Sequence, residues 1–237
     1  MHIPDGVLDP GVLAVSGVAA AGAVVAAGWT MRRGLSGARG RVGLALAGGA
    51  GVLVAHLVDV SLGGAQTAHL MGGALLAIAL GPSLGLAVMT AVLALEALAW
   101  GDGGVAALGA NVLIMGVAGV WGGWFAYRGV LRAVARMRGS GALRGGAPGD
   151  RWRVAAAAAG GLASVLASTV TLVAVNAASG LAVGAVLPHH LAWAVLEAAV
   201  TAAVVALALG WAAHRSRARE VVHRHVHVLD GDLEALG

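Results

Sequence analysis

Seven apolar stretches, most of them long enough to cross a lipid bilayer, constrain this chain more than any other feature. They cover residues 11–31, 42–60, 69–80, 83–100, 105–127, 154–176 and 187–213. A helix needs about 20 consecutive apolar residues to cross the hydrocarbon core. Composition agrees, because 59% of the 237 residues are hydrophobic and only 11% are charged. The sequence therefore predicts an all-α fold, a polytopic transmembrane bundle of about seven helices.

The third stretch is shorter than the others, and only Gly81 and Pro82 separate it from the fourth. Two forms are open at this point. The pair forms a hairpin that does not cross fully twice, or it forms two helices with a very tight connection.

The basic residues indicate the orientation of the chain. All fifteen are arginines, and they lie in three groups, between the first and second stretches, between the fifth and sixth, and after the seventh. With seven spans, all three groups fall on one side of the membrane. The positive-inside rule makes that side cytoplasmic. Basic residues placed in this way set membrane topology, so they do not point to a nucleic-acid partner.

This orientation predicts the organisation of the chain, with the N-terminus outside and the C-terminus in the cytoplasm of a multi-pass cell-membrane protein. The predicted regions are an extracytoplasmic segment at 1–10, a transmembrane domain at 11–213 with a cytoplasmic arginine-rich loop at about 128–153, and a cytoplasmic tail at 214–237.

The chain opens MHIPDG, and the aspartates ahead of the first span, with arginines behind it, are not the pattern of a cleaved signal peptide. We expect Met1 to be retained, because His2 is large. The Met1 amine, the backbone nitrogen of His2 and its Nδ1 can close two chelate rings on one metal ion. One more imidazole would complete a square-planar N₄ site, which suits Ni(II) or Cu(II). The alternative is a merely solvated histidine.

Polar residues in or beside the spans are candidates for the remaining ligand, because such groups are costly in a membrane and tend to mark functional sites. They are His56, His69, Glu96, Asn111, Asn176, His190 and Glu197. We favour His69, which follows an outward loop, over its alternative role as an interfacial histidine. We predict that His56 is a helix-packing residue hydrogen-bonded to a neighbour. Glu96, His190 and Glu197 are interpreted as packing or network residues.

Three segments together resemble a known family. MHIPDG, GGAQTAHLMGGALLAIALGP and WGDGGVAALGANVLIMG occur in this order, as in the CbiM/NikM nickel and cobalt substrate-binding membrane subunits of energy-coupling-factor (ECF) transporters. The resemblance runs from residue 1 to about 213. It implies that Ni(II) or Co(II) is the transported substrate, with no catalytic cofactor, and that Met1, His2 and His69 hold it. It also implies a supporting hydrogen bond from Asn111, whose alternative role is to join helices.

Nothing in the chain indicates ATP hydrolysis. A P-loop needs a lysine after its glycines, and the sequence contains no lysine. The resemblance implies that energy comes from two cytoplasmic ATPases through a membrane coupling (T) protein, often with a small additional membrane subunit. The chain is thus expected to be a transporter subunit and not an enzyme.

Other functions remain as alternatives. One is a structural or signalling membrane protein without a ligand, and another is an intramembrane enzyme using histidine and glutamate, which the absence of an HExxH motif disfavours. The arginine-rich loop is suited to contact anionic membrane lipid. His223, His225 and His227 in the tail would share one side of an extended chain, but a solvated tail is favoured over metal handling. The residues do not distinguish nickel from cobalt.

Overall fold

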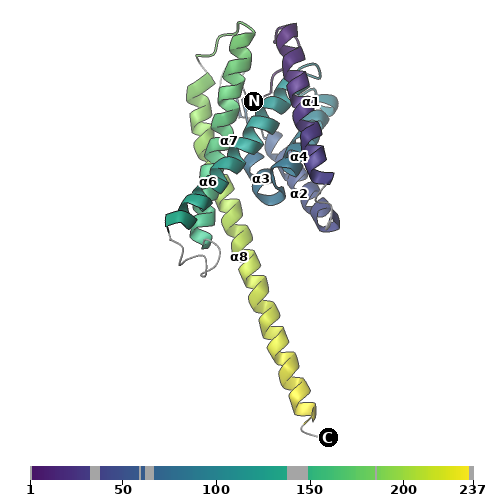
Figure 1. Ribbon diagram of the computed structural model, residues 1–237, viewed down its shortest axis with the longest axis vertical. Helices are drawn as coiled ribbons and strands as arrows, with labels where there is room; N and C mark the ends of the chain where they lie inside the picture. Colours follow the sequence, from purple (N-terminus) through teal and green to yellow (C-terminus); the bar gives the residue numbers. More distant parts are fainter. Residues whose placement is uncertain are drawn as a thin grey trace.

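The computed structural model of this protein describes residues 2–32, 38–58, 60–61, 67–137, 149–184 and 186–234. In these parts the chain is a bundle of helices with one short pair of antiparallel strands (Figure 1). The elements are α1 (Pro10–Arg32), α2 (Ala38–His56), β1 (Val60–Ser61), β2 (Thr67–Ala68), α3 (Gly73–Leu80), α4 (Pro82–Ala99), α5 (Leu108–Asn111), the π-helix η1 (Val112–Val120), α6 (Trp121–Met137), α7 (Asp150–Ala178) and α8 (Val186–Glu234).

Five helical segments in the described residues are long and apolar enough to cross a membrane. They are Pro10–Arg32, Pro82–Ala99, Leu108–Met137, Asp150–Ala178 and His189–Ser216. The helix Arg41–His56 is apolar but shorter. Large apolar side chains such as Val15 and Leu207 are exposed on the outside of the bundle, as expected where the solvent is lipid. The predicted polytopic helical bundle is therefore confirmed.

The third predicted span is not a full transmembrane helix. α3 has eight residues, so it is about 12 Å long and cannot cross a hydrocarbon core of about 30 Å. A non-helical segment, residues 69–72, leads into it. At the start of α4, the hydroxyl groups of Ser83 and of Thr30, near the end of α1, are hydrogen-bonded at 2.8 Å. The pair is therefore a hairpin in which only α4 is long enough to cross, and α4 starts on the side where α1 ends.

The arginine-bearing ends of the helices gather at one end of the molecule. In Figure 1 the end of α1, the start of α2, the end of α6 and the start of α7 all lie toward the lower side, where α8 leaves the bundle. The predicted loop at 128–153 is helical at both of its ends, because α6 continues to Met137 and α7 begins at Asp150. Residues 138–148 lie outside the described residues.

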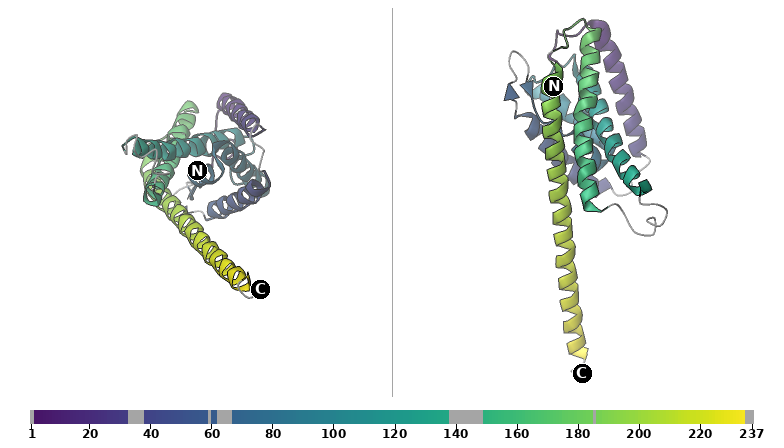
Figure 2. Two further views of the ribbon diagram at one scale, coloured as in Figure 1. Left: turned by 60° about the horizontal axis from the view of Figure 1, so that its bottom comes forward. Right: turned by 90° about the vertical axis from the view of Figure 1, so that its left-hand side faces the viewer.

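The predicted tail at 214–237 is largely a continuation of α8, which runs without a break to Glu234 and projects far beyond the other helices (Figure 2, right). The backbone around residues 223–227 is therefore helical. The extended conformation that would align the three tail histidines is not adopted.

The packing around η1 depends on small residues and on buried hydroxyl groups from α7. A Cβ atom on Gly123 would lie 2.9 Å from the Cβ of Ala74, so α6 and α3 approach closely there. The hydroxyl groups of Ser164 and Ser168 donate to backbone carbonyl groups on η1, each at 2.8 Å. π-helical turns occur frequently at functional sites, and this one begins at the residue after Asn111.

Candidate metal-binding site

The N-terminal segment is folded into the bundle, where helices surround it (Figure 2, left). Ile3 is buried, and its N–H donates to Oδ1 of Asn111 at 2.9 Å. Nδ2 of Asn111 donates to the Ile3 carbonyl at 3.1 Å, and the Gly104 N–H donates to the same carbonyl at 2.9 Å. Asn111 thus holds both backbone groups of the residue that follows His2.

The turn in IPDG is anchored as well. The carboxylate of Asp5 accepts hydrogen bonds from the N–H groups of Val105 and Ala107, at 3.1 and 3.0 Å, just before α5. Gly103 has a φ of 79°, and a Cβ atom there would lie 3.0 Å from Nδ1 of His2. The loop before α5 therefore packs directly against the first residues of the chain, and this contact requires glycine.

Three histidines meet at this point. His2 comes from the N-terminal segment, His56 from the end of α2, and His69 from the non-helical segment before α3. One ring nitrogen from each lies within 4.8 Å of the others. The ring centroids are 4.2 Å apart for His56 and His69, 4.9 Å for His2 and His69, and 5.6 Å for His2 and His56. All three side chains are buried.

The imidazole of His2 is buried and lies close to two carboxylates. Its buried Nε2 has no hydrogen-bond partner in the described part of the chain. The carboxylates of Glu96 and Asp102 lie 3.8 and 3.9 Å away, beyond hydrogen-bond distance. Burial is the main cause that lowers the pKa of His2 to about 2, and the positive charge of the chain's N-terminus is the next. The imidazole is therefore neutral at physiological pH, as a metal ligand must be.

His56 is the third histidine of the cluster, for which the sequence favoured a packing role. The prediction that it is hydrogen-bonded to a neighbour is confirmed, because its Nδ1 donates to Glu96 at 2.9 Å. Its Nε2 lies 3.2 Å from the Met71 carbonyl. These two contacts hold the ring in a fixed orientation beside His69. Glu96, which we interpreted as a network residue, therefore lies directly behind the histidine cluster.

Glu197 stabilises the segment that carries His69. Residues 69–72 are not helical, and backbone N–H groups at membrane depth are costly unless they are hydrogen-bonded. The N–H groups of Met71 and Gly72 both donate to the carboxylate of Glu197 on α8, at 2.8 and 2.7 Å. Gly72 has a φ of 69°, and a Cβ atom there would lie 2.6 Å from Val52. The buried carboxylate of Glu197 and the glycine at position 72 together stabilise the non-helical backbone that carries His69.

Comparison with known proteins agrees with this geometry. The family model CbiM, described as a cobalt uptake substrate-specific transmembrane region, matches residues 2–214. The chain belongs to this family. Two relatives of the CbiM family are a fused nickel transport protein, NikMN, of Archaeoglobus fulgidus and the cobalt transport protein CbiM of Geobacter sulfurreducens. They are 35% and 34% identical over 56% and 59% of this chain. The aligned parts span 43% and 39% of those proteins, less than half of their length.

A solved structure supports the same conclusion. A crystal structure of a transition metal transporter matches with a TM-score of 0.70 and 26% identity, over 89% of this chain and 93% of that one. The chain is thus a membrane component of the nickel and cobalt transport family. This membership places it among metal transport components and not among catalytic enzymes.

Proposed function

We propose that this chain captures Ni(II) or Co(II) on the outer side of the cell membrane and delivers the ion for ATP-driven uptake by partner subunits. The observation that carries the proposal is the buried cluster of His2, His56 and His69 in a chain of the CbiM family. Imidazole nitrogen suits both metals. The names of the relatives, nickel transport for one and cobalt transport for another, support the same pair of substrates.

The proposed ligands are the amine of Met1, the backbone nitrogen and Nδ1 of His2, and the imidazole of His69. Met1 lies outside the described residues, and its free amine is part of the proposal. Asn111 supports this set, because its two hydrogen bonds to the Ile3 backbone position the chain next to His2. If Nδ1 of His2 binds the metal, its Nε2–H faces the carboxylates of Glu96 and Asp102. A shift of less than about 1 Å on metal binding would bring one of these carboxylates within hydrogen-bond distance, where it would orient the ligating histidine and raise its basicity.

The structure also suggests a second ligand set, the three imidazoles of His2, His56 and His69. We favour the N-terminal set, because both ring nitrogens of His56 already face oxygen atoms of Glu96 and Met71. Coordination by His56 would break one of these contacts. In the favoured arrangement His56 and Glu96 form a wall of the site.

The partners belong to the same proposal. The sequence contains no lysine for a P-loop, so we infer that cytoplasmic ATPases act through a membrane coupling (T) protein, together with a small additional membrane subunit. The gathering of the arginine-bearing helix ends on one side supports a cytoplasmic C-terminus and an outer metal site.

The proposal is tested by bound nickel and cobalt per protein. The purified full chain is compared with a form that has two extra residues before Met1, with His69→Ala and with His56→Ala. His214→Ala, which alters an exposed histidine of α8, is the matched control. The extension converts the amine into a peptide nitrogen and changes no side chain. We expect the extended protein and His69→Ala to lose metal by more than about 100-fold in affinity, because each removes a chelating donor.

The two ligand sets give different results. The N-terminal set is supported by two results together. The extended form loses metal, and Ni(II) in the native form is diamagnetic, as expected for square-planar coordination. Full loading of the extended form together with loss in His56→Ala would replace it by the three-imidazole set. Unchanged loading of the extended form, His56→Ala and His69→Ala would show that the metal binds elsewhere.

A further inference from the structure

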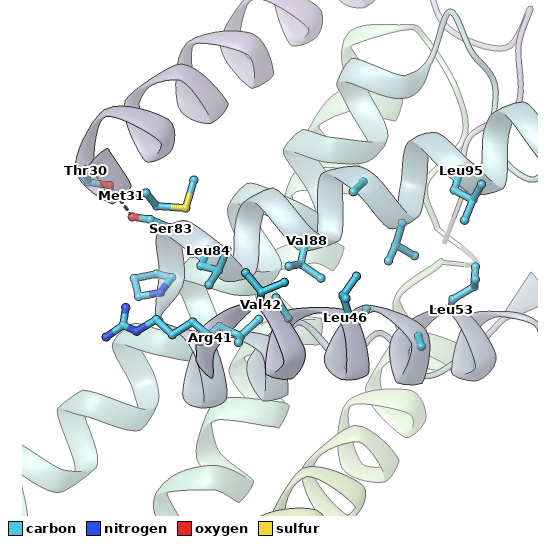
Figure 3. A pocket seen from close by; sticks show the side chains of 18 residues that line it. Thr30, Met31, Arg41, Val42, Leu46, Leu53, Ser83, Leu84, Val88 and Leu95 are labelled. Atoms are coloured by element: carbon cyan, nitrogen blue, oxygen red, sulfur yellow. Dashed lines mark hydrogen bonds between the residues drawn. The ribbon is translucent and has the colours of Figure 1, made fainter. Parts of the chain in front are cut away.

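A groove of about 710 Å³ lies on the outside of the bundle (Figure 3), and His2, His56 and His69 are not among the residues that line it. It runs between α2 and α4 and reaches the end of α1. Its walls are almost wholly apolar, with Val42 and Leu46 of α2 facing Leu84 and Val88 of α4 in Figure 3.

Polar groups occur at one end of the groove. In Figure 3, Arg41 lies at the end where Thr30 and Ser83 also stand, and Leu53 and Leu95 lie at the other. Arg41 forms no ion pair with any described residue, and no acidic side chain is among the described residues that line the groove. The Thr30 hydroxyl donates to the Ala27 carbonyl at 2.7 Å and accepts a hydrogen bond from the Ser83 hydroxyl, so the group at this end that is open to an anion is the Arg41 guanidinium. This end therefore suits an anion, and the rest of the groove suits a hydrocarbon chain.

The length of the groove selects the kind of occupant. The part of α2 between Arg41 and Leu53 is about 18 Å long at about 1.5 Å per residue. One leaflet of the hydrocarbon core is about 15 Å thick, half of a core of about 30 Å. A transmembrane helix of a partner would extend along the full core, whereas one acyl chain extends along one leaflet. The groove matches the acyl chain.

We propose that this groove is a binding site for an anionic phospholipid of the leaflet on the arginine-rich side. One acyl chain lies between α2 and α4, and the phosphate contacts Arg41. Small residues make room for the chain, because Ala45, Gly49 and Ala91 line the groove. None of the proposed metal ligands lines the groove. A negative result for lipid binding would therefore leave the proposed transport function unaffected.

The test uses the full chain, purified in detergent and stripped of lipid, with palmitoyl-oleoyl phosphatidylglycerol and phosphatidylcholine titrated separately and counted by native mass spectrometry. Arg41→Gln removes the charge, and Ala91→Phe fills the groove. Arg132→Gln, an exposed arginine of α6 that does not line the groove, is the matched control for charge. Circular dichroism of each variant reports whether it is folded.

We expect the native chain and Arg132→Gln to bind one phosphatidylglycerol at least about fivefold more tightly than phosphatidylcholine, the discrimination expected of one arginine at a membrane surface. Arg41→Gln should lose this preference and keep its affinity for phosphatidylcholine, and Ala91→Phe should weaken both lipids. If Arg41→Gln and Arg132→Gln prefer phosphatidylglycerol over phosphatidylcholine to the same degree, the assignment of the headgroup to Arg41 is wrong. Unchanged lipid binding by Ala91→Phe, with loss of a co-purifying membrane subunit, would overturn the site in favour of a protein helix.

Discussion

Replacing Asn111 with alanine is expected to weaken metal binding while leaving the bundle folded. The side chain is buried, and both of its polar atoms are used on Ile3. After truncation the Ile3 carbonyl keeps its hydrogen bond from Gly104. The Ile3 N–H loses its partner. The substitution therefore leaves one buried donor unsatisfied beside the proposed metal ligands.

The structure sets the size of the effect. An unsatisfied buried N–H costs about 1–3 kcal/mol, and the second lost hydrogen bond contributes about 0.5–1.5 kcal/mol, so the docked segment is destabilised by about 2–4 kcal/mol. We expect the segment before α1 to undock while the helices stay folded, because it carries only two of the buried apolar side chains of the core, Ile3 and Leu8. The loss then appears as a smaller fraction of binding-competent protein, which raises the apparent Kd by the same factor. We expect a rise of about 30-fold to several hundredfold.

The assay is Ni(II) and Co(II) affinity of the purified full chain by calorimetry, together with the thermal midpoint of the metal-free protein. Asn176→Ala, which removes the same side chain type from the C-terminal end of α7, is the control and should bind metal as the native chain does. A positioning role predicts a large change in affinity with a small change in the thermal midpoint.

Two results would refute this reasoning. One is an affinity of Asn111→Ala within about threefold of the native value, less than about 1 kcal/mol. The other is a large fall in the thermal midpoint while the folded fraction binds metal normally, because Asn111 would then serve the bundle and not the N-terminal segment.

Two further predictions concern the same site. Glu197→Gln should lower metal affinity by roughly 5- to 150-fold. The amide oxygen of glutamine can accept from only one of the N–H groups of Met71 and Gly72, whereas the carboxylate accepts from both. A calorimetric affinity equal to that of the native chain would contradict this prediction. Metal-free protein should lose stability as pH falls below 6.5, because the pKa of His2 is 6.5 when unfolded and about 2 when folded. The unfolded state then binds more protons than the folded state. This lowers the free energy of unfolding by up to about 2 kcal/mol at about pH 5. Thermal midpoints that do not change between about pH 7 and about pH 5, or that change equally in His2→Ala, would exclude this role of His2.

The location of the site was predictable only in part. His2, His69 and Asn111 stand in motifs that the sequence shows, and the structure brings them to one place. His56 was one of the candidate ligands, because it is a polar residue within an apolar span, but VLVAHLVDV does not show that it lies beside His2 and His69. A carboxylate inside a span is a sign of function, but the partner of Glu96 is 40 residues away in the chain.

The sequence alone predicts a helical membrane protein, a one-sided distribution of arginines and the short motifs that carry the candidate nitrogen ligands. These properties depend on the length, polarity and order of neighbouring residues. Only the tertiary structure decided that the third span is a short helix behind a non-helical segment, that His56 joins the other two histidines, and that Glu197 holds the segment of His69. The reason is physical: Glu197 is 126 residues from Met71, and its contact with that backbone exists only because α8 packs where α3 begins.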